Sequence, residues 1–311
     1  ILPIIDQAVH HALGQQPGPV HINSPFREPL IFDAKKHKPS ISPKLETWKK
    51  STQPYTTWHS PSLSKKPSLS TQTAKSLLQQ VNADMPGCII ASETTGASDD
   101  TQAILALAQH LNWHVLPDIT SGLRLGATHP QTLPYYDLML DRDDAPYLIP
   151  HQTVIHFGGQ ITSKRLLTFL KNASPKTYVH IDPYARRSDP FSLATHQLNI
   201  SPADFYEWIK DNTKPWKPAN HNTRHQEKQQ QAALHLTQAI AAALDACLPN
   251  DDTLTEPTVC RTISAMIPHN HALFLGNSLP IREMDTFGTH AGAPAKVYAN
   301  RGASGIDGNI A

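Results

Sequence analysis

Short apolar runs alternate with amphipathic stretches from about residue 72 onward. Runs of four or five mostly apolar residues predict buried strands at 87–91, 113–116, 153–157 and 177–181, and a further strand is predicted at 195–200. Apolar residues at helical spacing predict helices between them, at 72–82, 99–111, 135–140 and 162–171 and from Ser201 onward. Strands that alternate with helices form parallel sheets. The pattern therefore predicts an α/β fold with a central doubly wound parallel sheet.

The two ends of the chain contain elements of the same kinds, but too few to fold alone. A helix over 3–14 and a strand over 19–23 open the sequence. The last stretch, 223–311, predicts helices at 223–247 and 257–267 and strands at 271–275 and 297–299. We therefore expect an internal piece of a longer protein, with the end of one domain at 1–30 and the start of another at 223–311.

Two polar segments separate these parts. Residues 31–71 are rich in Pro, Ser and Lys with scattered aromatic residues, and residues 211–222 are rich in Lys, Pro and Asn. We interpret 31–71 as a linker that packs through its rings, with full disorder as the alternative. Residues 72–210 then form the central α/β domain, and 211–222 form a second linker.

Composition excludes several classes of function. The 311 residues carry a net charge of +1, which gives no general attraction to nucleic acid, and no apolar run reaches the length of a membrane span. No signal peptide is visible. Three widely spaced cysteines indicate a reducing compartment, so we expect a cytoplasmic protein. Cys88 and Cys260 lie among apolar residues, which favours the core over a nucleophilic role.

Two cations stand where a helix is predicted to begin. The segment Gly158-Gly-Gln-Ile-Thr-Ser-Lys-Arg165 follows a strand, and it places Lys164 and Arg165 in a first helical turn. Cations oppose the macrodipole there, so their placement is easier to explain if an anion binds at this terminus. Two solvated side chains are the alternative.

A second candidate anion site comes from two later strand ends. In Gly276-Asn-Ser-Leu-Pro-Ile-Arg282, a glycine turn is followed by Ser278 and then by Arg282 one helical turn later. Arg301 follows the next strand and enters a loop with glycine at every third position. Two arginines and a serine on one face suit a dianionic or dicarboxylate substrate. A tight surface turn with a solvated arginine is the alternative.

One histidine pair in the sequence has the spacing of metal ligands. His221 and His225 have a spacing that suits a metal on a helix, but no third ligand is visible nearby. We expect both side chains to be exposed to solvent. No P-loop and no zinc quartet occurs in the sequence.

Four segments resemble the MenD family, the thiamine-diphosphate-dependent 2-succinyl-5-enolpyruvyl-6-hydroxy-3-cyclohexene-1-carboxylate (SEPHCHC) synthases of menaquinone biosynthesis. The longer three are Gly18-Pro-Val-His-Ile-Asn-Ser-Pro-Phe-Arg-Glu-Pro-Leu30, Gly276-Asn-Ser-Leu-Pro-Ile-Arg282 and Asn300-Arg-Gly-Ala-Ser-Gly-Ile-Asp-Gly308. The fourth is Thr162-Ser-Lys-Arg-Leu166. Their order and spacing fit essentially the whole chain.

The resemblance implies a transferase that uses thiamine diphosphate and Mg²⁺. Residues 1–30 would complete a pyrimidine-binding domain, and 223–311 would begin a diphosphate-binding domain. In this family 2-oxoglutarate is decarboxylated, and its succinyl unit is added to isochorismate. By resemblance, the succinyl carboxylate would be held by Ser278, Arg282 and Arg301. Isochorismate would be reached by Lys164 and Arg165. Ile306 would form an apolar wall beside the cofactor. A homodimer or homotetramer is expected, because the family's active site lies between subunits.

Two family features do not occur in this sequence. The glutamate that activates the cofactor has no counterpart, and the Gly-Asp dipeptide of the Mg²⁺ and diphosphate motif is absent. No catalytic residue and no metal ligand are therefore assigned. The segment alone is expected to be inactive and to bind thiamine diphosphate poorly, which tight stoichiometric binding would contradict.

Two alternative functions stay open. One is another thiamine-diphosphate decarboxylase or carboligase acting on pyruvate-like acids, although a small monocarboxylate needs fewer cations. The other is a non-catalytic nucleotide-binding module on the central sheet, although the strand at 87–91 leads into Ala-Ser-Glu-Thr-Thr-Gly rather than a glycine-rich turn.

Overall fold

The protein divides into two compact units, Ile1–Ser62 and Leu63–Ala311. A computed structural model describes residues 2–13, 18–20, 22, 43–52, 70–82, 85–94, 98–126, 129–184, 188–217, 221–248 and 253–300. In these residues no helix combines the length and the apolar character that crossing a membrane requires.

The first unit contains two helices among its described residues, α1 (Leu2–Leu13) and α2 (Pro43–Lys49). The helix predicted at 3–14 is confirmed. The strand predicted at 19–23 is wrong as far as it is described, because Pro19, Val20 and Ile22 belong to no strand. An apolar run becomes a strand only where a neighbouring strand pairs with it. Within the predicted linker, α2 has Glu46 in its first turn and Lys49 in its last, which suits the helix macrodipole.

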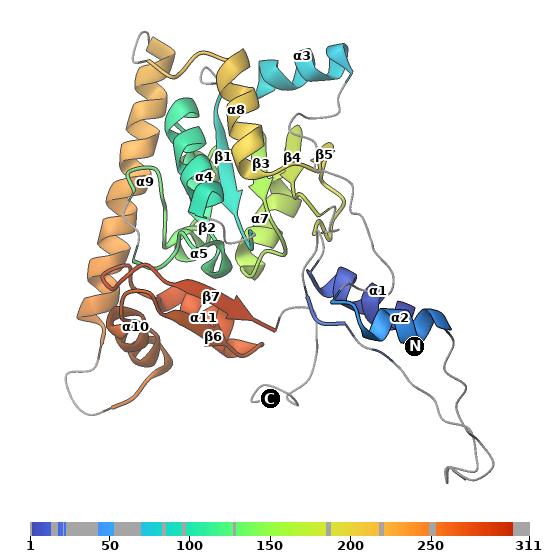
Figure 1. Cartoon of the computed structure of the whole chain (residues 1–311). Helices are drawn as coiled ribbons and strands as arrows, with labels where there is room; N and C mark the ends of the chain where they lie inside the picture. Colours follow the sequence, from blue (N-terminus) through green and yellow to red (C-terminus); the bar gives the residue numbers. More distant parts are fainter. Residues whose placement is uncertain are drawn as a thin grey trace. The chain divides into compact units, whose positions relative to one another are not determined.

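The second unit is built on a five-stranded sheet with the order β2-β1-β3-β4-β5, in which every neighbouring pair is parallel (Figure 1). Its strands are β1 (Gly87–Ala91), β2 (His114–Pro117), β3 (Thr153–Phe157), β4 (Thr177–Ile181) and β5 (His196–Leu198). The predicted α/β fold with a doubly wound parallel sheet is confirmed. Every residue of β1 to β4 is buried, which requires cover on both faces of the sheet.

Two apolar clusters supply that cover, one on each face. In β1, Ile89 belongs to the first cluster and Cys88 to the second, because alternate side chains of a strand point to opposite faces. The first face is covered by α3 (Thr71–Gln80), α4 (Ser98–Leu111) and α8 (Pro202–Asn212). The second is covered by α5 (Tyr136–Met139), α6 (Ala145–Leu148), α7 (Lys164–Ala173) and α9 (His221–Ala246).

The start of α8 shows how local sequence sets a helix boundary. The Ser201 side chain accepts a hydrogen bond from the backbone N–H of Asp204 at 3.0 Å, and its hydroxyl donates to the Asp204 carboxylate at 2.8 Å. Pro202 occupies the first helical position. The cap predicted from Ser201, Pro202 and Asp204 is therefore confirmed.

The cysteines behave as the apolar pattern indicates. Cys88 and Cys260 are buried, whereas Cys247 is exposed, and all three are free thiols. Burial raises the pKa of Cys88 to about 12 and that of Cys260 to about 11. Neither of the two buried thiols forms a thiolate near neutral pH, which agrees with their predicted place in the core.

The last part of the chain packs beside the central sheet. It contains α10 (Glu256–Met266), β6 (Ala272–Leu275), α11 (Leu279–Phe287) and β7 (Lys296–Ala299), and β6 pairs with β7 in parallel. A third apolar cluster joins these elements to the short 3₁₀ helix η1 (Ile119–Ser121) that follows β2. The long helix α9 packs on the second face of the central sheet through Ala233. The boundaries at 210 and 223 between a central and a following domain stay a prediction.

Candidate functional site

The residues that follow the parallel strands meet at one edge of the sheet. Ser92 follows β1, Asp118 follows β2 and Gly158 follows β3. Open parallel sheets bind ligands at this edge, where the order of the strands reverses. In this sheet the reversal lies between β1 and β3.

The turns after β1 and β3 pack against each other at that reversal point. The Ser92 hydroxyl lies within hydrogen-bond distance of the backbone oxygens of Phe157 (3.0 Å) and Gly159 (2.9 Å). The Gly159 N–H donates to the Glu93 carbonyl at 2.9 Å. A Cβ at Gly158 would lie 2.2 Å from that carbonyl oxygen. This close packing of the two turns disfavours a nucleotide site between β1 and β3.

The neighbouring part of the edge is organised by the buried carboxylate of Asp118. It accepts hydrogen bonds from the Thr120 N–H (2.9 Å) and hydroxyl (2.7 Å) in η1. It also accepts from the Thr162 N–H (2.6 Å) and hydroxyl (3.1 Å), just before α7. Asp118 thus fixes the start of α7 to the turn after β2.

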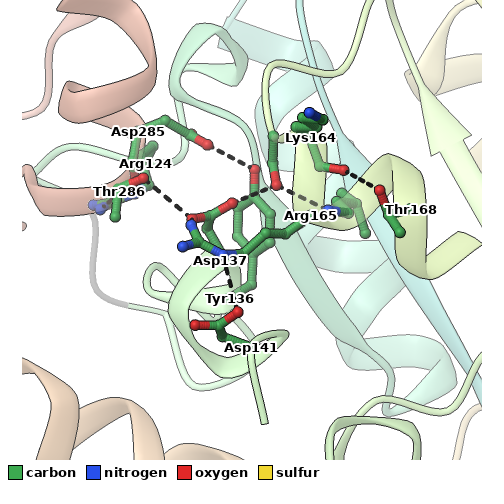
Figure 2. A network of polar contacts seen from close by, with 11 residues as sticks. Arg124, Tyr136, Asp137, Asp141, Lys164, Arg165, Thr168, Asp285 and Thr286 are labelled. Carbon is green, nitrogen blue, oxygen red and sulfur yellow. Dashed lines mark hydrogen bonds and ion pairs between the residues drawn. The ribbon is translucent and has the colours of Figure 1, made fainter. Parts of the chain in front are cut away.

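A second carboxylate, Asp137 of α5, lies against the same helix terminus. It accepts hydrogen bonds from the Ser163 hydroxyl, from Arg165 Nη1 (2.7 Å) and from the Thr286 hydroxyl of α11 (3.2 Å) (Figure 2). Its side chain is 6 % exposed. This carboxylate therefore links α5, α7 and α11.

The third carboxylate, Asp285, comes from α11. It accepts hydrogen bonds from the Ile119 N–H (2.8 Å) and the Tyr136 hydroxyl (3.0 Å). The buried guanidinium of Arg124 donates to the Asp285 backbone oxygen through Nε (3.1 Å) and Nη2 (2.8 Å). These contacts attach α11 to the carboxyl edge of the central sheet.

Burial and the proximity of the three carboxylates raise the pKa of two groups, Asp285 and Tyr136. Burial, together with the negative charges of Asp118 and Asp137, holds the pKa of Asp285 well above its ordinary value, and the Arg124 guanidinium opposes this only in part. Burial and the same three carboxylates raise the pKa of the Tyr136 hydroxyl. Tyr136 therefore stays protonated and able to donate its hydrogen bond at neutral pH.

One of the two cations predicted at the start of α7, Arg165, lies beside these carboxylates. Arg165 pairs with Asp137 at 2.7 Å and approaches Asp141 at 3.5 Å, and its side chain is 44 % exposed. Lys164 is exposed. Asp137 and Asp141 pair with Arg165, so the placement of this one cation is explained without a ligand. Binding of substrate by Lys164 and Arg165 stays a prediction.

Both cations also line a groove on the outside of α7. The groove has a volume of about 860 Å³, and Asp141, His151 and Phe169 are among its other lining residues. The rings of His151 and Phe169 meet edge to face with centroids 5.3 Å apart. The exposed parts of Lys164 and Arg165 are therefore accessible to a small molecule from solvent.

The start of α11 is a strained, exposed turn. Ser278, the N-cap residue, has φ 73° and ψ −119°, and its side chain makes no capping hydrogen bond. A non-glycine residue with positive φ stores strain, which is most often tolerated at functional sites. Arg282 follows one turn later and is exposed.

The turns after β6 and β7 lie against each other. The Asn277 side-chain amide donates to the backbone oxygen of Asn300, and the register pairs Leu275 with Ala299. Arg301 and Ile306 lie outside the described residues, as do the side chains of His221 and His225. The described residues contain no group of three or more His, Cys, Asp or Glu that suits a metal ion.

Sequence reasoning missed the carboxylates. Asp118, Asp137 and Asp285 show no common spacing, and Asp137 and Asp285 are separated along the chain by more than a hundred residues. The one available signal was Asp118, an acidic residue directly after a buried strand. The cluster arises from tertiary contacts, which local periodicity does not report.

Comparison with known proteins shows the family of this chain. A family model described as the middle domain of thiamine pyrophosphate (another name for thiamine diphosphate) matches residues 40–275. The chain belongs to this family. The matched range of this middle-domain family includes α2, the whole five-stranded sheet, α7 and β6, so it covers the carboxylates Asp118 and Asp137 but not α11.

Whole-chain relatives in the middle-domain family confirm the resemblance to SEPHCHC synthases. The chain is 35 % identical to such a synthase from Chlorobium phaeobacteroides and 30 % identical to one from Salinibacter ruber, each over 100 % of this chain and 51 % of the relative. It is 30 % identical to the chloroplastic protein PHYLLO of Arabidopsis thaliana, over 99 % of this chain and 19 % of that protein. The chain thus spans about half the length of the synthases that it matches.

Proposed function

We propose that this chain carries substrate-binding residues of a thiamine-diphosphate-dependent transferase that decarboxylates 2-oxoglutarate and adds the succinyl unit to isochorismate. The observation that carries the proposal is the similarity to curated SEPHCHC synthases over the full length of the chain. The matched middle-domain family supports the cofactor class. Two exposed cationic sites on different elements are consistent with two carboxylate-bearing substrates.

The succinyl carboxylate is assigned to the turns after β6 and β7. Ser278 offers a hydroxyl at the N-terminus of α11, where the helix macrodipole favours an anion. Arg282 and Arg301 supply guanidinium groups, which bind a carboxylate through two parallel hydrogen bonds. The contact between Asn277 and Asn300 supports this assignment, because Arg301 directly follows Asn300.

Isochorismate is assigned to the start of α7. Lys164 has an exposed ammonium, and Arg165 keeps almost half of its side chain in solvent while Asp137 holds one of its nitrogens. A carboxylate that approaches from the groove meets two positive charges at one helix terminus. Ile306 is proposed as an apolar wall beside the cofactor.

The described residues contain no cluster of acidic, histidine or cysteine side chains that suits the cofactor's metal. Mg²⁺ in such sites is bound by carboxylates and phosphate oxygens. No suitable cluster occurs among the described residues, and the sequence has no Gly-Asp dipeptide. We therefore assign the polar residues of this chain to the substrates.

The alternative functions are less well supported. The packed turns between β1 and β3 disfavour a nucleotide-binding module. A decarboxylase for pyruvate-like acids leaves the second arginine without a carboxylate partner. We further propose a cytoplasmic homodimer or homotetramer, since the family resemblance places the active site between subunits.

Lys164→Ala tests whether the start of α7 binds isochorismate and not 2-oxoglutarate. In the protein from the complete reading frame, this change is expected to raise the KM for isochorismate at least about fivefold, or about 1 kcal/mol, because one of the two cations is lost. The KM for 2-oxoglutarate should change by less than about twofold. Steady-state kinetics with each substrate varied in turn measures both.

Lys171→Ala is the matched control on the same helix. Its ammonium lies 5.3 Å from the centre of the Phe191 ring, away from the start of α7. The two constants should stay near their wild-type values in this variant. Equal effects of Lys164→Ala and Lys171→Ala on isochorismate would remove Lys164 from the proposed site.

A further inference from the structure

The buried carboxylate of Asp137 joins the two elements that carry the proposed substrate sites. It accepts hydrogen bonds from Ser163 and Arg165 at the start of α7 and from Thr286 on α11. Asp137 itself belongs to α5 and is 6 % exposed. A charged acceptor held among donors from two other elements fixes those elements relative to each other.

Toward α7, Asp137 orients both the helix cap and the guanidinium. The Ser163 hydroxyl donates to Asp137, while its oxygen accepts from the Leu166 N–H at 2.9 Å. Arg165 Nη1 is held by Asp137, and Nε lies 3.5 Å from the exposed Asp141. Two contacts on one planar group set its orientation, so less conformational freedom is lost when a ligand carboxylate binds.

On the side of α11, Asp137 contacts Thr286, which belongs to the helix that carries the proposed succinyl site. Thr286 lies one helical turn after Arg282, and the intervening rise is about 6 Å. The same helix is fixed at Asp285 by the Ile119 N–H and by Arg124. A movement of α11 against α7 would therefore disturb the contacts of Asp137.

We propose that Asp137 is a positioning residue for the addition step, which aims Arg165 toward isochorismate and ties it to α11. This inference rests on the proposed function. Asp137 acts through Arg165 and does not itself contact substrate in this scheme. Without its negative charge, the guanidinium of Arg165 is free to turn toward Asp141, and the preset orientation is lost.

Asp137→Asn tests this role in the protein from the complete reading frame. The amide keeps the shape of the side chain but loses the charge. We expect the KM for isochorismate to rise at least about tenfold, and at least about five times more than the KM for 2-oxoglutarate. Glu207→Gln is the matched control, because it removes a charge from the exposed pair with Lys210 on α8, away from the groove. It should change either constant by less than about twofold.

A double-mutant cycle distinguishes positioning from a general structural role. On an Arg165→Ala background, Asp137→Asn should have no further effect on the KM for isochorismate, because its effect passes through Arg165. If Asp137→Asn does not fold, Thr286→Val replaces it. That change removes one donor to Asp137 and should raise the same constant at least about twofold, again only while Arg165 is present.

Each outcome decides a separate question. Equal rises in both KM values, or an effect of Asp137→Asn that persists without Arg165, would overturn the positioning role. Wild-type protein that does not use isochorismate would overturn the proposed function, and the positioning role with it. A selective effect that disappears without Arg165 supports both.

Discussion

Alanine in place of Gly158 is expected to destabilise the protein by about 3 kcal/mol or more, because strain and a backbone clash act together. Gly158 has φ +88°, a conformation that residues with a Cβ rarely adopt. The added Cβ would lie 2.2 Å from the Glu93 carbonyl oxygen. The turns cannot separate to relieve the clash without losing the bond between the Gly159 N–H and that oxygen. Urea unfolding followed by circular dichroism measures the loss.

Gly276→Ala is the control for this prediction. A Cβ at Gly276 has no atom within 4 Å, so the substitution should change the free energy of unfolding by less than about 1 kcal/mol. If both variants unfold at the same urea concentration, the turns after β1 and β3 do not pack as closely as described. The argument against a nucleotide site at that point would then fail as well.

Arg301→Lys is expected to raise the KM for 2-oxoglutarate at least about tenfold in the protein from the complete reading frame, or about 1.4 kcal/mol. Lysine keeps the positive charge but lacks the planar fork that binds both oxygens of a carboxylate. The effect therefore tests the two-point contact and not the charge alone. Initial rates over a range of 2-oxoglutarate concentrations give the constant directly.

Arg142→Lys is the matched control, since Arg142 is an exposed arginine that pairs with Asp144 at 2.7 Å. Exposed pairs of this kind contribute little, so the KM for 2-oxoglutarate should stay within about twofold of wild type. An unchanged constant in Arg301→Lys as well would leave Arg301 as a turn residue. The succinyl site would then depend on Ser278 and Arg282.

The sheet could be predicted closely from the sequence, because most of its strands are short, mostly apolar runs. The bounds of β3 and β4 agree with the predicted 153–157 and 177–181, and Ser201 and Pro202 mark the start of α8. The prediction failed where an apolar run is not paired, as at Val20 and Ile22. It also missed α2 inside a polar segment, because a short helix leaves little periodic signal.

The candidate site could be predicted only in part. The sequence indicates Lys164 and Arg165 because cations at a helix N-terminus are unusual, but the buried anion that pairs with Arg165 is Asp137. These carboxylates reach α7 through the fold and not through sequence spacing. The sequence indicates Ser278 as a hydroxyl near an arginine, and its positive φ becomes visible only in the structure.

The first measurement should be CO₂ release from 2-oxoglutarate by the protein from the complete reading frame, with thiamine diphosphate and Mg²⁺, with and without isochorismate. The proposed function predicts turnover of 2-oxoglutarate that isochorismate stimulates. Turnover with pyruvate and none with 2-oxoglutarate would contradict it and indicate another decarboxylase. Absence of turnover with either acid would contradict the proposed activity altogether.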